Sequence, residues 1–180
     1  MDLTSLKGAP QEVGGEFTCS NCFDLTSLEG GPQKVGSSFY CNSCNKLTNL
    51  KGAPQEVGGG FYCAYCNGLT SLKGAPREVH GDFCCNSCNK LTNLKGAPRE
   101  VGNGTNTSSF DCSYCNNLTS TDGAPKNVNG HFVCRECFKL TSIKGNGNSV
   151  KYNFLCDNCG KKFTVEDIKK HFNVGGIISV

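Results

Sequence analysis

Seven Cys-x-x-Cys pairs are the residues of this chain best suited to chemistry, and they recur at an almost constant interval. Two such pairs held together form a typical zinc site, because four thiolates can share one tetrahedral ion. The pairs begin at Cys19, Cys41, Cys63, Cys85, Cys112, Cys134 and Cys156. Successive pairs are 22 residues apart, except for one interval of 27 residues, which contains five extra residues within 102–109. This spacing indicates a repeat protein.

Each unit reads approximately L-T-S-L-K-G-A-P-x-x-V-G-G-x-F-x-C-x-x-C-x-x. A unit of this size cannot bury a face of its own, so neighbouring units must stack and share one core. The F-x-C phrase alternates apolar and variable residues, which predicts a half-buried strand with Phe39 and Cys41 inward and Tyr40 outward. Glycine and proline in the G-A-P phrase exclude a helix, so the return arm of each coil is predicted to be extended or turn-like.

Two phrases of the unit resemble a known family. The strand phrase at Phe39, Cys41, Cys44 and Leu47 is similar to the cysteine variant of the leucine-rich repeat, and the phrase from Leu69 to Pro76 resembles repeat proteins of bacterial and bacteriophage genomes. The resemblance covers residues 3–161 and implies a β-solenoid of leucine-rich-repeat type. It further implies seven coils of about 22 residues, a parallel sheet on a concave face, and a binding surface without enzymatic activity. We expect residues 1–180 to form a single solenoid domain.

The cysteines have two competing interpretations. In the structural one, the first cysteine of each pair is a small apolar core residue, and the second fills an inward turn position. In the functional one, pairs from adjacent coils lie about 4.8 Å apart and hold zinc. We favour the structural interpretation, without a cofactor, because the coil already explains both positions and seven pairs cannot be divided evenly between four-cysteine sites. A redox role is disfavoured, since no context that would lower a thiol pKa recurs.

The C-terminal end contains a second candidate zinc site. Its residues resemble the first three ligands of a Cys-Cys-His-His zinc finger: Cys156, Cys159 and His171. A closed site needs a fourth ligand, and no second histidine follows.

A capping element is the favoured interpretation of the same segment. Thr164 and Asp167 form a near-match to a capping box, which predicts a short amphipathic helix from Val165 to Phe172. We expect residues 162–180 to cap the solenoid. The N-terminal end has no such cap, so it is a candidate for self-association into a homo-oligomer.

The outward strand positions form the candidate binding surface. Four tyrosines are predicted to gather near the middle of the concave face: Tyr40, Tyr62, Tyr65 and Tyr114. Tyrosine is enriched in binding hot spots. The extra residues at 102–109, which include Asn103 and Asn106, are predicted to form a loop that contributes to the same site. Cys84 occupies a tyrosine position, and we favour a plain replacement over a reactive exposed thiol.

Composition restricts the function. Eighteen basic and fifteen acidic residues give a net charge of +3, too small to indicate nucleic-acid binding. No apolar run would span a membrane, and no signal peptide precedes the repeats, so we expect a cytoplasmic protein, in the host cytoplasm if phage-encoded. No catalytic set is recognisable. The sequence thus predicts a non-catalytic interaction protein with a protein partner. The alternatives are a zinc-binding module, including a nucleic-acid-binding one, and a small-ligand sponge.

Overall fold

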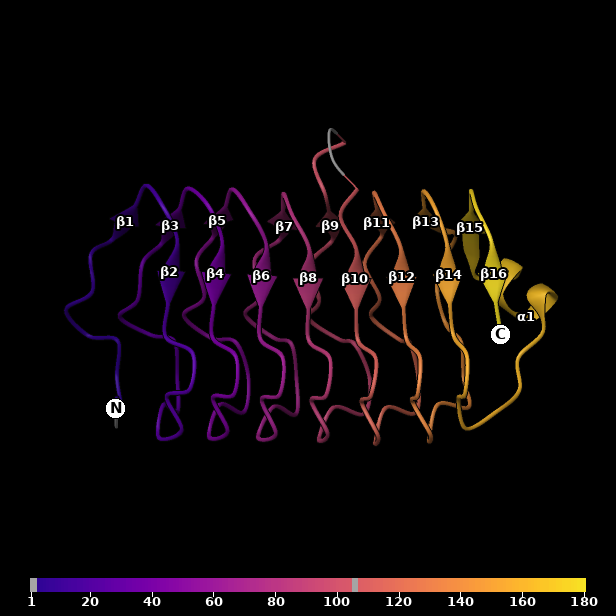
Figure 1. Ribbon diagram of the computed structural model, residues 1–180, viewed down its shortest axis with the longest axis horizontal. Helices are drawn as coiled ribbons and strands as arrows, with labels where there is room; N and C mark the ends of the chain where they lie inside the picture. Colours follow the sequence, from indigo (N-terminus) through magenta and orange to yellow (C-terminus); the bar gives the residue numbers. More distant parts are fainter. Residues whose placement is uncertain (1–2, 105–106) are drawn as a thin grey trace.

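Strands of two or three residues, two to each coil, build the molecule. The computed structural model describes residues 3–104 and 107–180, and the chain winds through about eight turns of a parallel β-solenoid (Figure 1). The N-terminal and C-terminal ends lie at opposite ends of its long axis. The predicted solenoid is therefore confirmed.

One strand of each coil belongs to a continuous parallel sheet, which we call the eight-stranded sheet. Its members in chain order are β2 (Phe17–Thr18), β4 (Phe39–Tyr40), β6 (Phe61–Tyr62), β8 (Phe83–Cys84), β10 (Phe110–Asp111), β12 (Phe132–Val133), β14 (Phe154–Leu155) and β16 (Ile178–Ser179). Each strand pairs with the equivalent residues of the next coil. The 27-residue interval keeps this register, because Phe110 still pairs with Phe83.

The return arms form a second layer of parallel strands behind the first (Figure 1). Its strands are β1 (Glu12–Val13), β3 (Lys34–Val35), β5 (Glu56–Val57), β7 (Glu78–Val79), β9 (Glu100–Val101), β11 (Asn127–Val128), β13 (Asn148–Val150) and β15 (Phe172–Val174). This layer is divided into a three-stranded sheet that ends at β5 and a five-stranded sheet that begins at β7. The sequence predicts extended return arms but only one sheet.

The core lies between the two layers. Phe39 and Cys41 are fully buried while Tyr40 is half-buried, as the alternation predicts. The repeated phenylalanines form one stack of near-parallel rings along the solenoid, with neighbouring centroids 4.8–5.5 Å apart. Leucines and the valines of the second layer complete this apolar interior. Stacking therefore gives each small coil the core that it cannot build alone.

The turn after each first cysteine requires one residue with a left-handed backbone conformation. The third residue of every Cys-x-x-Cys phrase has φ between 55° and 59°, as at Ser43, Tyr65 and Tyr114. The corner between the two strands of a coil instead requires close backbone approach. A Cβ atom at Gly36 would lie 2.3 Å from the Gly14 carbonyl oxygen, so a larger residue at this corner would force the backbone to shift.

The C-terminal segment differs from its predicted form. The capping box at Thr164 and Asp167 is present, but helix α1 covers only Val165–Lys169. The sequence predicts a helix that extends to Phe172, but Phe172 instead begins β15, where its buried ring packs on Phe154. The segment thus adds an eighth strand to each layer, whereas seven coils were expected. Among the described residues, no helix is long and apolar enough to cross a membrane.

Candidate functional site

A row of side chains runs along the outer surface of the eight-stranded sheet. Strand register places its members side by side: Thr18, Tyr40, Tyr62, Cys84, Asp111, Val133, Leu155 and Ser179. Tyr40 and Tyr62 stack with their ring centroids 4.8 Å apart and their planes 9° apart. Tyr62 lies over Gly60, where a Cβ atom would come within 2.6 Å of the ring and hydroxyl. The glycine therefore lets one tyrosine lie close to the sheet, and the pair forms a preorganised aromatic surface.

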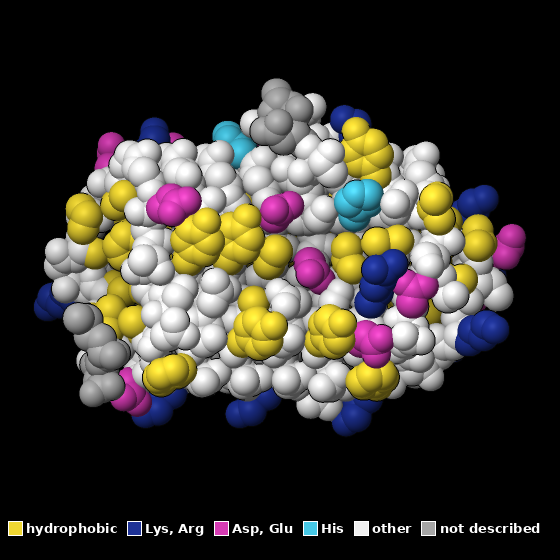
Figure 2. All heavy atoms as spheres, in the orientation of Figure 1, with side chains coloured by type: hydrophobic (Ala, Val, Ile, Leu, Met, Phe, Trp, Pro, Cys, Tyr) yellow, Lys and Arg dark blue, Asp and Glu magenta, His cyan; other side chains and the backbone are white. Residues whose placement is uncertain are grey.

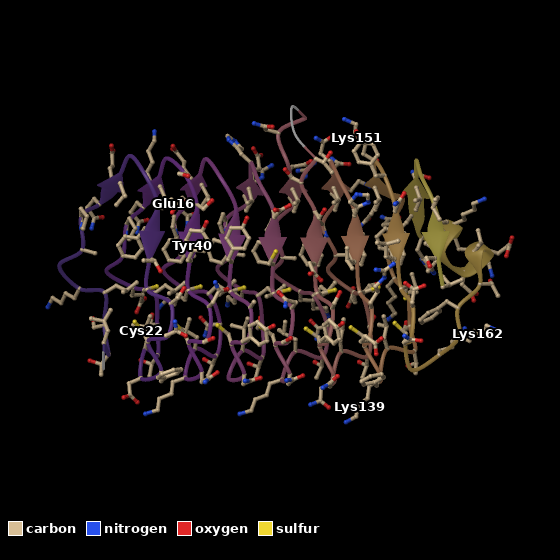
Figure 3. The ribbon with its side chains drawn as sticks, viewed as in Figure 1. Glu16, Cys22, Tyr40, Lys139, Lys151 and Lys162 are labelled. Atoms are coloured by element: carbon tan, nitrogen blue, oxygen red, sulfur yellow. The ribbon has the colours of Figure 1, made fainter. Side chains whose placement is uncertain are left out.

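Two carboxylates flank this tyrosine pair. The Tyr40 hydroxyl donates to Glu16 and the Tyr62 hydroxyl donates to Asp82, each over 3.4 Å. Figure 3 shows Glu16 and Tyr40 on the same part of the sheet. Burial, followed by the negative charge of Asp82, raises the pKa of Tyr62 to about 12. The surface is therefore aromatic with an acidic border, as Figure 2 shows for this face.

Asp82 also joins the tyrosine pair to the base of the long loop at residues 102–109. One of its oxygens accepts from the Tyr62 hydroxyl, and the other accepts from the Ser109 backbone N–H at 2.7 Å. Figure 1 shows the connection between β9 and β10 extending beyond the equivalent turns of other coils. Asn103 is exposed on this loop, whereas Asn106 lies outside the described residues. The predicted face and the predicted loop thus meet at one aspartate.

The other two predicted tyrosines occupy a different place. Tyr65 and Tyr114 lie in the left-handed cysteine turns rather than on strands, because each strand ends before the first cysteine. Their side chains are 55% and 54% exposed. Among the described residues, neither ring stacks on another aromatic ring. They are therefore accessible, but the strand position predicted for them is wrong.

Sequence reasoning missed the two carboxylates. Glu16 and Asp82 occupy the position immediately before the strand phenylalanine, which is Ser38 in the second coil. Comparing that position between coils would have revealed two acidic residues on either side of the tyrosine pair. Asp111 is a third acid in the same area, opposite Cys84 in the strand register.

The cysteine pairs form a ladder of thiol hydrogen bonds between coils. The second cysteine of each pair, from the second coil onward, donates its thiol to the backbone carbonyl of the first cysteine in the preceding coil. The Cys66 thiol, for example, lies 3.1 Å from the Cys41 carbonyl oxygen. These carbonyls point into the core and need a donor, since an unpaired buried carbonyl is costly. The regular spacing of the second cysteine has this structural explanation.

Burial holds most interior thiols in their protonated form; the exception is Cys44, whose pKa is lowered by its hydrogen bond with the Cys19 thiol. Burial raises the pKa of the Cys66 and Cys115 thiols to about 12, and raises that of Cys63 well above its usual value. Cys84 is half-buried, and desolvation together with Asp111 and Asp82 raises its pKa to about 12. All fifteen cysteines are free thiols.

The three residues of the predicted zinc-finger-like site, Cys156, Cys159 and His171, do not form a metal site. Within residues 3–104 and 107–180, no group of three or more histidine, cysteine or acidic side chains could hold a metal ion. The His171 ring contacts the Gly145 carbonyl at 3.2 Å, whereas the Cys159 thiol contacts the Cys134 carbonyl. These contacts direct the predicted third ligand away from the two sulfur atoms.

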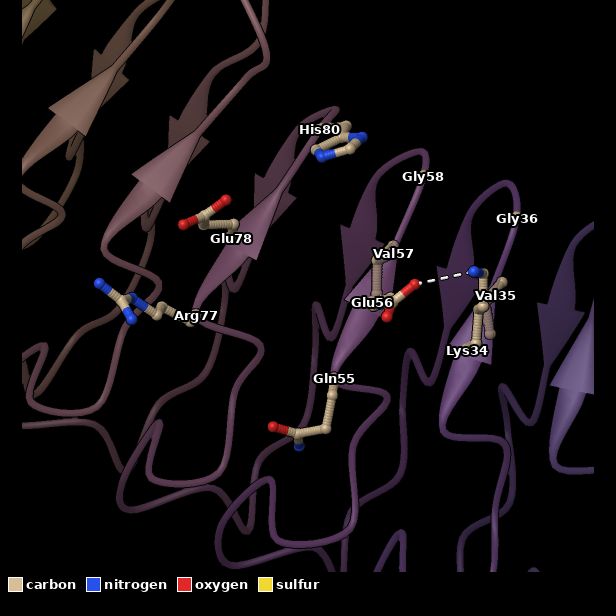
Figure 4. Close-up of a pocket in the computed structure, with 10 residues that line it drawn as sticks. All are labelled: Lys34, Val35, Gly36, Gln55, Glu56, Val57, Gly58, Arg77, Glu78 and His80. Carbon is tan, nitrogen blue, oxygen red and sulfur yellow. Dashed lines mark ion pairs between the residues drawn. The ribbon is translucent and has the colours of Figure 1, made fainter.

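A shallow groove of about 580 Å³ crosses the second layer at its division between β5 and β7 (Figure 4). Lys34 and Glu56 form an ion pair of 3.0 Å on one side, and Arg77, Glu78 and His80 lie on the other. Charges of both signs line it, so it has no net preference for an anion or a cation. The groove therefore adds no assigned function.

Comparisons with family models, curated proteins and solved structures found no match.

Proposed function

We propose that the chain is a non-catalytic interaction protein of leucine-rich-repeat type, which binds a protein partner through the outer surface of its eight-stranded sheet. The observation that carries the proposal is the stacked Tyr40–Tyr62 pair with carboxylates at both hydroxyls. Two rings held parallel lose little side-chain entropy on binding, and tyrosine supplies a large contact area.

The partner segment proposed for this surface carries arginine or lysine. Glu16, Asp82 and Asp111 supply negative charge beside aromatic rings, and a guanidinium or ammonium group can use both through ion pairing and cation–π contact. Because Asp82 also accepts from Ser109, we propose that the same partner touches the loop at residues 102–109.

The test is partner capture from a lysate of the source cells with matched surface variants. Replacing Tyr40, Tyr62, Tyr65 and Tyr114 by serine removes the proposed contacts, whereas Phe23→Ser with Phe138→Ser removes two equally exposed aromatics in the cysteine turns. We expect the tyrosine variant alone to lose capture and the parent to release its partner at high salt. Retention of every partner by the tyrosine variant would contradict the proposal.

The remaining assignments belong to the same proposal. Helix α1 and the final turn would close one end of the solenoid, since terminal repeats need a polar outer face. Self-association would use the N-terminal end, and the protein would act in the cytoplasm without a cofactor. The zinc-binding and small-ligand alternatives have no specific observation in their favour.

A further inference from the structure

We propose that Cys156 and Cys159 form a redox modification site, at which a hydroperoxide converts two thiols into one disulfide. Their sulfur atoms lie 3.4 Å apart. All seven Cys-x-x-Cys pairs fall within the described residues, and only here are the two sulfurs of one pair in hydrogen-bond contact. A small movement of one side chain would bring the atoms to bonding distance.

The same pair is open to reagents. Cys159 is half-buried, whereas the second cysteine of every other pair is buried. The cause is the end of the repeat, because the chain leaves the coil pattern after Cys159 and residues 160–162 are exposed. No further cysteine coil covers this sulfur. Geometry therefore separates this pair from the six others.

The Cys159 thiol, which donates to the Cys134 carbonyl oxygen, ionises more readily than an ordinary thiol. The thiols of Cys134 and Cys156 stabilise its charged form and lower its pKa. In an interior pair such as Cys63 and Cys66, burial instead raises the pKa of both thiols. The thiolate is the nucleophile in thiol oxidation, so the attacking atom is assigned to Cys159.

The reaction has two balanced steps. The Cys159 sulfur attacks one oxygen of the peroxide, the O–O bond breaks, and a sulfenic acid and one water molecule result after proton transfer. The Cys156 sulfur then attacks the Cys159 sulfur, forming the S–S bond and releasing the second water molecule. Overall, the two thiols lose two protons and two electrons, and hydrogen peroxide becomes two water molecules.

Oxidation would change the contact between the last two cysteine coils. The Cys159 thiol donates to the Cys134 carbonyl oxygen at 3.1 Å, and a disulfide sulfur has no proton to donate. That buried carbonyl would lose its partner, which is destabilising. The site thus couples the oxidation state to the packing of the final turn.

The experiment treats the folded, reduced, full-length protein with increasing hydrogen peroxide, followed by quenching, unfolding, alkylation and tryptic mass spectrometry. Cleavage after Lys151 and Lys161 gives a peptide that holds Cys156 and Cys159 and no other cysteine. We expect this peptide to escape alkylation, with a mass two hydrogen atoms below that of its unalkylated dithiol form, before any interior cysteine is oxidised. Cys159→Ser should abolish this product, and the control Cys115→Ser should leave its rate unchanged.

Three results would overturn the proposal. One is oxidation of the Cys156–Cys159 peptide no faster than that of interior cysteine peptides in the parent, a comparison that does not depend on any variant folding. Another is accumulation of a sulfinic acid at Cys159 with Cys156 still reduced. The third is a Cys115→Ser variant whose disulfide yield falls as far as that of Cys159→Ser.

Discussion

The phenylalanine stack gives the sharpest stability prediction. Phe83 is fully buried, and its ring stacks on Phe61 at 5.4 Å and on Phe110 at 5.5 Å. Replacing a buried phenylalanine by alanine costs about 3–5 kcal/mol, and each lost aromatic pair adds about 0.5–1.5 kcal/mol beyond burial. Because Phe83 has two ring partners, we expect Phe83→Ala to lower the free energy of unfolding by about 4–8 kcal/mol.

Two other phenylalanines provide matched comparisons in urea unfolding. Phe17 is half-buried with one ring partner, so Phe17→Ala should cost about half as much. Phe138 is 58% exposed, so Phe138→Ala should change the stability by less than about 0.5 kcal/mol. A shift of the urea midpoint by Phe83→Ala no larger than the shift by Phe138→Ala would contradict a buried phenylalanine stack.

Four further outcomes are expected. Cys115→Ala should lower the free energy of unfolding by about 1–3 kcal/mol more than Cys115→Ser, because serine can still donate to the Cys85 carbonyl; equal losses would contradict the thiol ladder. Gly36→Ala should shift the urea midpoint strongly and Gly14→Ala hardly at all, because only the former brings a Cβ atom against backbone, at 2.3 Å. With reductant present, the melting temperature should fall as the pH rises from about 9 towards 12, because thiols such as Cys66 have a folded pKa of about 12 against 9.0 unfolded. The folded state therefore binds more protons in this range, and a rising melting temperature there would contradict this sign. Native mass spectrometry should give the metal-free mass with a melting curve insensitive to chelator, and two or more zinc ions per chain would favour the zinc-module alternative.

The sequence was sufficient to predict the coil, because its information is repeated seven times. A fixed interval determines the stacking partner of every residue, and alternation around Phe39 determines which side chains face inward. The longer interval before Phe110 did not obscure this, since Phe110 still pairs with Phe83 and the strand register is intact.

The parts that sequence reasoning missed depend on contacts that a single unit does not reveal. The second layer consists mostly of strands of two residues, such as Glu56–Val57, too short for a period to be recognised. The column of outward residues two positions after each first cysteine places Tyr65 on a strand, yet its positive φ places it in a turn. Phe172 lies in a strand and not in the predicted helix, because it pairs with Asn148 in the strand register. This contact joins segments 24 residues apart in the sequence.

The sequence predicts the tyrosines of the candidate site but not its carboxylates, again because the latter depend on contacts between coils. Tyr40 and Tyr62 follow from register alone, so their stacking could be expected from the repeat. The roles of Glu16 and Asp82 depend on which way two side chains turn at the strand entrance, and hydrogen bonds to the tyrosine hydroxyls settle that direction.

Hydroxyl-radical footprinting of the complex with its captured partner tests the central claim most directly, because it reads side-chain accessibility residue by residue. We expect slower oxidation of Tyr40 and Tyr62 in the complex, with the oxidation of His80 on the second layer unchanged. Unchanged oxidation of both tyrosines, with protection of His80 in the groove instead, would contradict a binding surface on the eight-stranded sheet.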